Sequence, residues 1–533
     1  MILNISKIIV SYFFLIILFL SLTGLGKILN NKFFQIKYIN FYENFIIGVF
    51  FLIFILQIHI IFFPINLASS YAIIILLIIG LGSSFGYIKK NINSKFILSL
   101  AICGLVISNS SIYPDYNTIY DFGLYHKTYM NWLNQENMPI GLANLHFRFG
   151  YSGSSYLIGS FFNFYPLFEK GYVLTSSIFF VFLIFVLIHE IDFKENNYSN
   201  IFNILIFYVI LKYLLVESIG DVSPDKISSC LLIFIFYNLI KNNNLKIENN
   251  ILFSFITLFI LITLGSSNWF IVSLLLLYFV WEFFFDLKNS IKIVSSCIIL
   301  GIFFALLSFL KSGNIFYPII FPIIDTFFTV TSNEALYNIK NFPKGYPEGM
   351  EWLIPTLKNT IIANKFVFLY LLSIFILLLL MLTKLRKTVL RNKILLKLTL
   401  IIIISIFFWF FNAPVIRYAK IYFWIGFIAI FSFYFKIFIN KKFYPIMFIF
   451  IFSYCIFSSL NNLAINRSDV TESQAIEKHP LKEKIEIYDG KYVFYGGLNY
   501  SNEKFHIPNL PVGGNIKNLI YKKDFFSKIY FKD

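Results

Sequence analysis

The sequence predicts an all-α polytopic membrane protein with about 14 transmembrane helices. Its 533 residues are 58% hydrophobic and only 13% charged, with a mean hydropathy of +0.76, a balance that no soluble fold needs. Apolar runs of about 20 residues, the length of one membrane crossing, recur along the chain. These runs are continuously apolar rather than alternating, which favours helices over the strands of a membrane barrel.

We expect membrane spans at residues 7–26, 44–63, 68–88, 96–110, 171–189, 201–217, 227–240, 251–265, 269–285, 291–310, 365–383, 394–411, 419–438 and 443–460. The first run has no small-residue cleavage site, so we interpret it as a retained span rather than a removed signal. Residues 1–460 form the polytopic region. Residues 461–533 are more polar and form a small external C-terminal region, either α/β or irregular.

Clusters of lysine and arginine orient the spans, because connections that face the cytoplasm are enriched in them. Six basic connections fall on one side, which we predict to be cytoplasmic. They contain Lys27, Lys32 and Lys37; Lys89, Lys90 and Lys95; Lys241 and Lys246; Lys288 and Lys292; Lys384, Arg386, Lys387, Arg391 and Lys393; and Lys441 with Lys442. The connections 110–170, 217–226, 311–364 and 412–418 then lie on the opposite face, periplasmic in a bacterial inner membrane.

Neither the net charge nor the cysteines indicate a further class of partner. The charge of +17 reflects a chain rich in Lys, Asn, Ile and Phe throughout, so we expect no nucleic-acid partner. The four cysteines lie in or at the ends of expected spans, without the spacing of a disulfide framework or a metal site. They are Cys103, Cys230, Cys297 and Cys455, and we expect them to pack as buried residues.

The loop 110–170 concentrates ionisable side chains in an otherwise apolar chain, among them Asp121, His126, His146 and Arg148. Such charges are expensive inside hydrocarbon, so the loop must lie outside it. Helical spacing predicts a short interfacial helix over 121–135 and a second amphipathic helix over 152–164. Asp121 then stands near a helix start, where it is either a cap or a functional carboxylate.

Two other external connections add charged groups to the same face. Asp221 and Asp225 follow one another in VESIGDVSPDKISSC, and carboxylates from two loops can bind a divalent cation or act as a base and its partner. Asp225 is equally explained as a helix cap after Pro224. Arg417 and Lys420 lie where an external connection enters a span, against the positive-inside rule. An anionic headgroup or pyrophosphate substrate explains these two cations, with simple snorkelling as the alternative.

The order of these features resembles the GT-C-type glycosyltransferases, which use a polyprenyl-phosphate-linked sugar at the external membrane face. The resemblance rests on Asp121 in YDFGLYHKTYMNWL, on SGNIFYP at 312–318 and on APVIRY at 413–418. Together with GLANLHFRFG and SPDK, these motifs also resemble an uncharacterised family of bacterial multispanning membrane proteins over roughly residues 100–420. Asp121 is followed by Phe122, whereas many GT-C enzymes have two adjacent acids at this point.

The GT-C resemblance implies Asp121 as the general base for an acceptor hydroxyl, and His126, His146 and Arg148 as residues that orient the substrates. Arg417 and Lys420 would stabilise the departing lipid phosphate. A divalent cation, Mg²⁺ or Mn²⁺, is a further option, with Asp121, Asp221 and Asp225 as oxygen ligands. The partners implied are a lipid-linked sugar donor, a glycan or lipid acceptor, and membrane lipids.

Three other readings remain open from the sequence. A polysaccharide polymerase or ligase of the O-antigen type would use Arg148, in HFRFGYSG, as its central cation. A transporter or lipid flippase would carry ionisable groups at mid-span, where this chain offers little beyond Lys212. A purely structural membrane scaffold is the third.

Overall fold

The structure is a computed structural model of the whole chain. It describes residues 2–36, 40–112, 126–144, 147–150, 153–167, 171–192, 198–216, 222, 224–241, 247–265, 268–283, 287–315, 317, 326, 329, 370–372, 374, 393–412, 416–438, 445–446, 449 and 453, and the strand residues 484–488, 492–496, 519–523 and 528–532.

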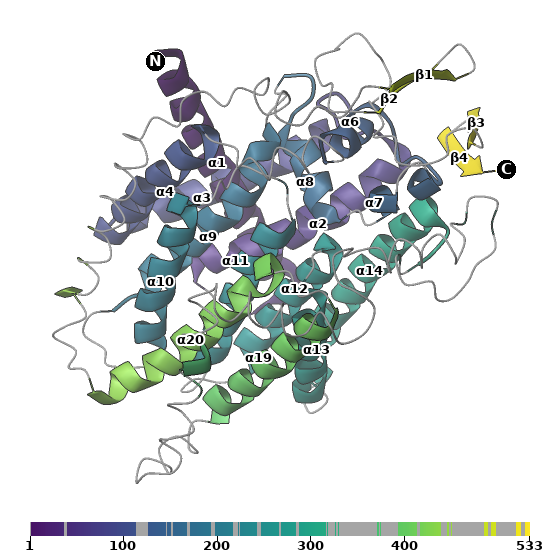
Figure 1. The fold of residues 1–533 in the computed structure, drawn as a ribbon. Helices are drawn as coiled ribbons and strands as arrows, with labels where there is room; N and C mark the ends of the chain where they lie inside the picture. Colours follow the sequence, from purple (N-terminus) through teal and green to yellow (C-terminus); the bar gives the residue numbers. More distant parts are fainter. Residues whose placement is uncertain are drawn as a thin grey trace.

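Long helices dominate the described part of the chain (Figure 1). They are α1 (Ile2–Leu29), α2 (Asn44–Phe62), α3 (Tyr71–Asn91), α4 (Ser94–Ile112), α9 (Leu174–Glu190), α10 (Tyr198–Val216), α11 (Pro224–Lys241), α12 (Ile247–Leu264), α13 (Trp269–Phe283), α14 (Leu287–Ser312), α19 (Lys393–Asn412) and α20 (Ile416–Phe438). Each coincides with one of the fourteen predicted spans. The predicted spans 365–383 and 443–460 lie almost wholly outside the described residues.

Four stretches are long and apolar enough to cross a membrane: Ile9–Phe34, Phe41–Phe62, Tyr71–Asn91 and Ile291–Ser312. Seven shorter apolar helices accompany them: Ser94–Gly104, Leu174–Glu190, Tyr198–Ile210, Leu252–Leu264, Phe270–Val280, Leu395–Phe410 and Ala419–Phe433. The protein is therefore a helical membrane protein. The sequence predicts fourteen crossings, which is more than the four long stretches and seven shorter apolar helices found among the described residues.

Helices α1, α2 and α3 pack with their backbones in contact, because glycines face one another across the helix pairs. A Cβ atom on Gly48 would overlap the carbonyl of Leu22, and one on Gly80 would overlap the carbonyl of Ser21. Ser84 Oγ also donates to the Leu20 carbonyl at 2.7 Å. Small residues that allow close approach are a common basis of helix association in membranes, where apolar burial gives little drive.

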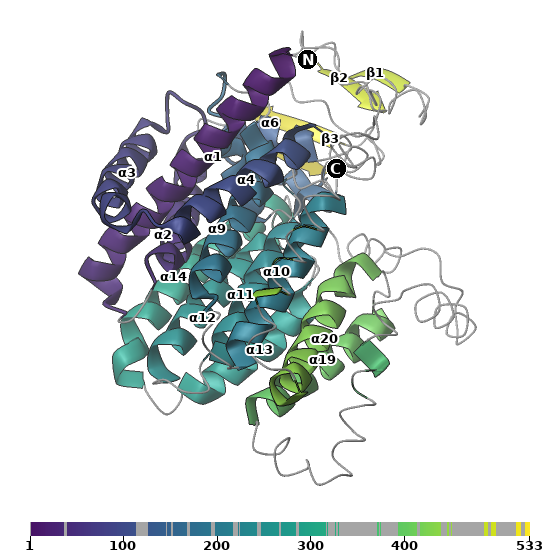
Figure 2. The same ribbon diagram turned by 90° about the vertical axis from the view of Figure 1, so that its left-hand side faces the viewer.

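Helix α9 is the centre of the bundle, and its residues Leu174–Ile188 are all buried. Helices α1, α4, α10 and α11 pack around it, as the turned view shows (Figure 2). Helices α12 and α14 continue the bundle on the far side of α2, while α19 and α20 form a pair beside α13 and α10. A helix buried on every side reads as uniformly apolar, which explains why α9 shows no amphipathic pattern.

Short helices cover one end of this bundle. They are α6 (Lys127–Gln135), η4 (Leu142–Asn144), α7 (Phe147–Gly150), α8 (Ser154–Phe162) and η5 (Gly171–Val173). Helices therefore occur in both stretches of the loop where the sequence predicts them, as α6 within 121–135 and α8 within 152–164. Their placement at the membrane interface stays a prediction. Trp132 is fully buried, and all nine residues of α8 are buried, because both helices pack into the bundle rather than lie on its rim.

At the end of the bundle opposite the short helices, η1 (Asn30–Phe34) and η2 (Phe41–Glu43) lie between α1 and α2. The C-terminal region contains two antiparallel hairpins, β1 (Lys484–Tyr488) with β2 (Tyr492–Gly496), and β3 (Leu519–Lys523) with β4 (Lys528–Lys532). Strand β4 lies beside η4, at the end of the bundle that the short helices cover.

The glycine contacts predict a clear difference between two substitutions on α3. Gly80→Ala forces a methyl group onto the α1 backbone and should destabilise the fold by about 1–3 kcal/mol. Gly82→Ala is the matched control, since a Cβ there meets nothing within 4 Å. Thermal unfolding of both variants in detergent measures the difference. Equal midpoints would contradict the close packing of α1 on α3.

Candidate functional site

The covered end of the bundle is held together by backbone hydrogen bonds from the segment 126–144. The amide of Ile65, just after α2, donates to the Leu133 carbonyl in α6 at 2.7 Å, and Met138 donates back to Ile60 at 2.8 Å. Gly141 donates to the Leu310 carbonyl in the last turn of α14, also at 2.8 Å. The segment is thus fixed to the ends of two long helices, which makes it a rigid support for side chains.

His126 and Tyr156 form a close polar pair at this end. The Tyr156 hydroxyl lies 2.5 Å from His126 Nδ1, and the two rings stack with centroids 5.2 Å apart. His126 is only 6% exposed. His126 lies at the start of α6, opposite the first turn of α8. The hydrogen bond therefore joins two helices that are thirty residues apart in the chain. A buried imidazole in contact with a phenol can hold or transfer a proton.

The side-chain amine of Lys311 lies in the same cluster. Lys311, in the last turn of α14, is 3% exposed and its Nζ lies 5.9 Å from the ring centroid of Tyr129. Tyr129 in turn packs edge-on against Tyr156, with centroids 5.2 Å apart. A buried cation over an aromatic face is stabilised by the ring, and it also attracts anions strongly where little water screens it.

Tyr317 of the motif SGNIFYP packs against Gly150 of the segment HFRFG. Ser312 and Asn314 form a buried turn in which the Ser312 hydroxyl donates to the Asn314 carbonyl at 3.1 Å, and Gly313 has a positive φ of 72°. Beyond it, the Tyr317 ring occupies the space that a side chain at position 150 would need. Gly150 therefore lets the two motifs, 160 residues apart in the chain, approach each other.

A second polar group stands where α11, α13 and α20 begin. The Tyr422 hydroxyl donates to Asn268 Oδ1 at 2.6 Å, and Asn268 Nδ2 donates to Ser228 Oγ at 2.5 Å. The Ser228 hydroxyl donates in turn to the backbone carbonyl of Asp225, one turn earlier, at 2.9 Å. The first turns of α20, which carry Lys420, are thereby adjacent to the first turn of α11.

Helix α8 joins the two polar groups. A Cβ atom on Gly159, in the middle of α8, would meet Val222 Cγ1 at 2.7 Å and the Met130 sulfur at 3.0 Å. Val222 lies just before α11, and Met130 belongs to α6. The first turn of α11, which carries Asp225, and the His126–Tyr156 pair are accordingly parts of one end of the bundle.

The predicted site residues fall into three groups: those described with their side chains, those described by their backbone alone, and those outside the described residues. His126, Asp225 and Lys420 are described with their side chains, the last two half-buried. For Arg148 in α7 and Arg417 in α20 the backbone alone is described. Asp121, His146 and Asp221 lie outside the described residues, as does Cys455. The other three cysteines, Cys103, Cys230 and Cys297, are buried and unpaired, which confirms the expected packing role for them.

Several polar residues of this end were not singled out from the sequence, among them Tyr156, Asn268, Lys311 and Tyr422. Lys311 carried a usable signal, since it stands at the predicted external end of a span, against the positive-inside rule, like Arg417 and Lys420. The others are ordinary residues whose meaning depends on tertiary contacts. No cluster of three metal-ligating side chains occurs within the described ranges.

Comparison with known proteins gives a family and nothing beyond it. The model of the family described as "Domain of unknown function (DUF8201)" matches residues 8–424, and the chain belongs to this family. The match spans the long helices from α1 onward and all the polar groups described above. No curated protein matches the chain, and no solved structure matches it.

The His126–Tyr156 hydrogen bond gives a stability prediction. Tyr156→Phe leaves a buried imidazole nitrogen without this partner, which should destabilise the fold by about 1–3 kcal/mol. The matched control is Tyr12→Phe, which removes a hydroxyl that bonds the Leu100 carbonyl at 3.0 Å in a half-buried setting. Thermal unfolding compares the two variants. A smaller effect for Tyr156→Phe than for Tyr12→Phe would show that the pair contributes little.

Proposed function

We propose that this member of the DUF8201 family is a membrane glycosyltransferase of GT-C type. It transfers a sugar from a polyprenyl-phosphate-linked donor to a glycan or lipid acceptor of the cell envelope. The observation that carries the proposal is the joint burial of the His126–Tyr156 pair and the Lys311 ammonium under α6–α8. Proton-transfer groups and a buried cation at one helix end suit a reaction in which a phosphate departs.

The reaction exchanges one glycosidic bond for another. An acceptor hydroxyl, deprotonated by the carboxylate of Asp121, attacks the anomeric carbon, and the bond from that carbon to the phosphate oxygen breaks. The electron pair stays on the lipid phosphate, which leaves as an anion, and the proton stays on Asp121. Cations near the leaving phosphate lower the barrier because they meet charge that develops during the step. We assign this role to Lys311, Arg417 and Lys420.

The remaining assignments support binding and orientation. His126, held by Tyr156, orients one substrate, and His146 and Arg148 extend the same loop. Asp225 stands in the first turn of α11, which packs against α20 with Tyr422 and Lys420. There it can orient an acceptor hydroxyl or, with Asp121 and Asp221, hold a divalent cation. We further propose that all fourteen predicted segments cross a bacterial inner membrane and that the covered end faces the periplasm. Basic residues at the opposite connections support this orientation.

Transfer assays test the assignment of Asp121. Purified protein with a polyprenyl-phosphate sugar and candidate acceptors should show transfer that Asp121→Asn reduces by about 10²–10⁴-fold, the range expected for loss of a general base. Arg417→Ala should weaken transfer less. Asp115→Asn, which neutralises the nearest acid of the same loop, is the control and should keep activity. Full transfer by folded Asp121→Asn protein would refute the role.

The same assay separates the polymerase reading. Transfer from a polyprenyl-diphosphate oligosaccharide that is lost in Arg148→Ala, with Asp121→Asn unaffected, would favour an O-antigen-type polymerase or ligase. Arg148 lies in α7, next to the buried Phe149, whose ring stacks on Tyr129 with centroids 5.9 Å apart. This second candidate therefore uses the same end of the molecule with a different central residue.

Cysteine labelling tests the proposed orientation. Gln135→Cys in α6 and Lys90→Cys at the end of α3 place a thiol at exposed positions at opposite ends of the bundle. In intact cells, a membrane-impermeant maleimide should label the first variant and spare the second until the membrane is opened. The buried native cysteines of the described chain give a low background, and the parent protein measures the rest. The reverse pattern would invert the topology.

A further inference from the structure

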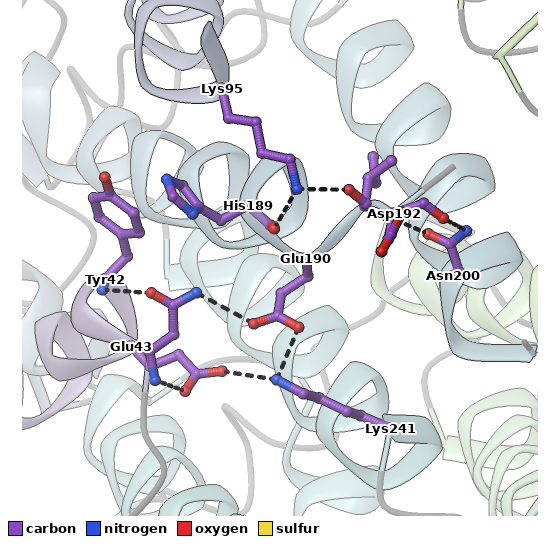
Figure 3. A network of polar contacts seen from close by, with 10 residues as sticks. Tyr42, Glu43, Lys95, His189, Glu190, Asp192, Asn200 and Lys241 are labelled. Carbon is purple, nitrogen blue, oxygen red and sulfur yellow. Dashed lines mark hydrogen bonds and ion pairs between the residues drawn. The ribbon is translucent and has the colours of Figure 1, made fainter. Parts of the chain in front are cut away.

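At the end opposite the candidate site, two carboxylates share one ammonium group (Figure 3). Lys241 Nζ lies 2.9 Å from Glu190 Oε2 and 3.9 Å from Glu43 Oε1. Glu43 ends η2 just before α2, Glu190 is the last residue of α9, and Lys241 is the last residue of α11. We call these three residues the acid–lysine cluster. It ties together elements from three separate parts of the chain.

Both carboxylates are also held by one asparagine. The backbone N–H of Asn40 donates to Glu43 Oε2 at 2.8 Å, and the side-chain Nδ2 of Asn40 donates to Glu190 Oε1 at 3.2 Å. Glu43 is only 4% exposed, so its carboxyl group has left water for a protein interior. Charges in such settings are costly unless each is paired and hydrogen-bonded.

The charged and titratable groups around the cluster are Lys27, Tyr42, Tyr87, Lys95, His189, Asp192 and Tyr237. The two other lysines are engaged elsewhere. Lys95 Nζ donates to the backbone carbonyls of His189 and Ile191, at 2.9 and 2.7 Å. Lys27 Nζ lies over the rings of Phe41 and Tyr87, at 5.7 and 5.9 Å from their centroids.

With both carboxylates ionised, the acid–lysine cluster carries one surplus negative charge. The helix ends make this charge still less favourable, because α9 and α11 both present their C-termini here and a helix C-terminus carries partial negative charge. Lys95 offsets that charge at the end of α9 alone. Within the described part of the chain, the Tyr42 hydroxyl and His189 Nε2 are buried polar atoms without a hydrogen-bond partner, and their rings lie 4.6 Å apart.

We propose that the acid–lysine cluster binds one proton, carried by Glu43, and that its release loosens the contact of η2 and α2 with the ends of α9 and α11. Glu43 is the carrier because Glu190 holds the short ion pair, whereas Glu43 Oε1 is 3.9 Å from the ammonium. The unused hydrogen-bonding capacity of Tyr42 and His189 suits a place where water and protons exchange. The Lys-rich side of the membrane would supply the proton. This proposal does not depend on the transferase activity.

The pH dependence of thermal unfolding tests the proposal. In the unfolded chain Glu43 is ionised above about pH 5, while the folded cluster keeps a proton at the acidic end of the range. Glu43 therefore binds more protons in the folded protein than in the unfolded protein, and its contribution to stability falls as pH rises. The buried Lys311 amine contributes in the opposite sense, so the contribution of Glu43 is measured as the difference between wild type and Glu43→Gln in detergent. We expect the wild-type unfolding midpoint to fall by a few degrees relative to that of the variant between pH 6 and pH 8.5.

Glu43→Gln is the decisive variant, since it keeps the shape of the side chain and removes the charge. Its unfolding midpoint should rise relative to that of the wild type as pH increases, and it should match or exceed the wild-type midpoint at pH 8.5. Asp192→Asn neutralises an exposed acid two residues beyond Glu190 and should retain the wild-type slope. A Glu43→Gln variant with the wild-type slope would overturn the proposal.

Infrared spectroscopy gives a second measurement if Glu43→Gln does not accumulate. The wild-type protein should show the carbonyl stretch of a protonated carboxylic acid near pH 6, and this band should disappear as pH rises. The band should be unchanged in Asp192→Asn. Its absence from wild-type protein at pH 6 would show that both carboxylates are ionised, and the proposal would fail.

Discussion

Three backbone hydrogen bonds, Ile65 to Leu133, Met138 to Ile60 and Gly141 to Leu310, anchor the covered end of the molecule. A polar segment can enter an apolar bundle only if its own N–H and C=O groups find partners there. The open ends of α2 and α14 supply those partners. Once the segment is fixed in this way, His126 meets Tyr156, and Tyr129 meets Lys311. Without the anchoring, these side chains would belong to an ordinary surface loop.

The same requirement explains how polar groups are distributed through the described bundle. Apolar side chains fill the middle of α9 and the facing helices, whereas the ionisable side chains gather at the two ends. Close helix packing comes from glycine and serine, as at Gly48, Gly80 and Ser84. The family to which the chain belongs is thus represented by a helical membrane protein with two chemically different ends. One has the His126–Tyr156 pair with Asp225 and the buried Lys311, and the other has the acid–lysine cluster of Glu43, Glu190 and Lys241.

Sequence periodicity and composition predicted much of the helix pattern but little of the polar pairing. Twelve expected spans coincide with helices because an uninterrupted apolar run of this length has few other structures open to it. Helix α8 was expected to be amphipathic and is buried all round. Two of its hydroxyl groups find partners inside the bundle: Ser154 accepts from Gln57 Nε2 at 3.2 Å, and Ser160 donates to the Met130 carbonyl at 3.5 Å. Tyr156 and Asn268 could not be identified because their partners come from other helices. Lys311 was accessible to the positive-inside argument, which had already marked Arg417 and Lys420.

The separation of Glu43 from Lys241 has a consequence for how the protein is made. About 200 residues lie between the two partners, and at about 5–20 residues per second their synthesis takes roughly 10–40 s. During that interval α1, α2 and α3 already exist while the lysine at the end of α11 does not. The nascent chain must therefore keep the Glu43 carboxyl group near water, and α2 can settle fully only after α9 and α11 have been inserted. Assembly of α1, α2 and α3 in the membrane is therefore complete only when α9 and α11, from the middle of the chain, have joined them.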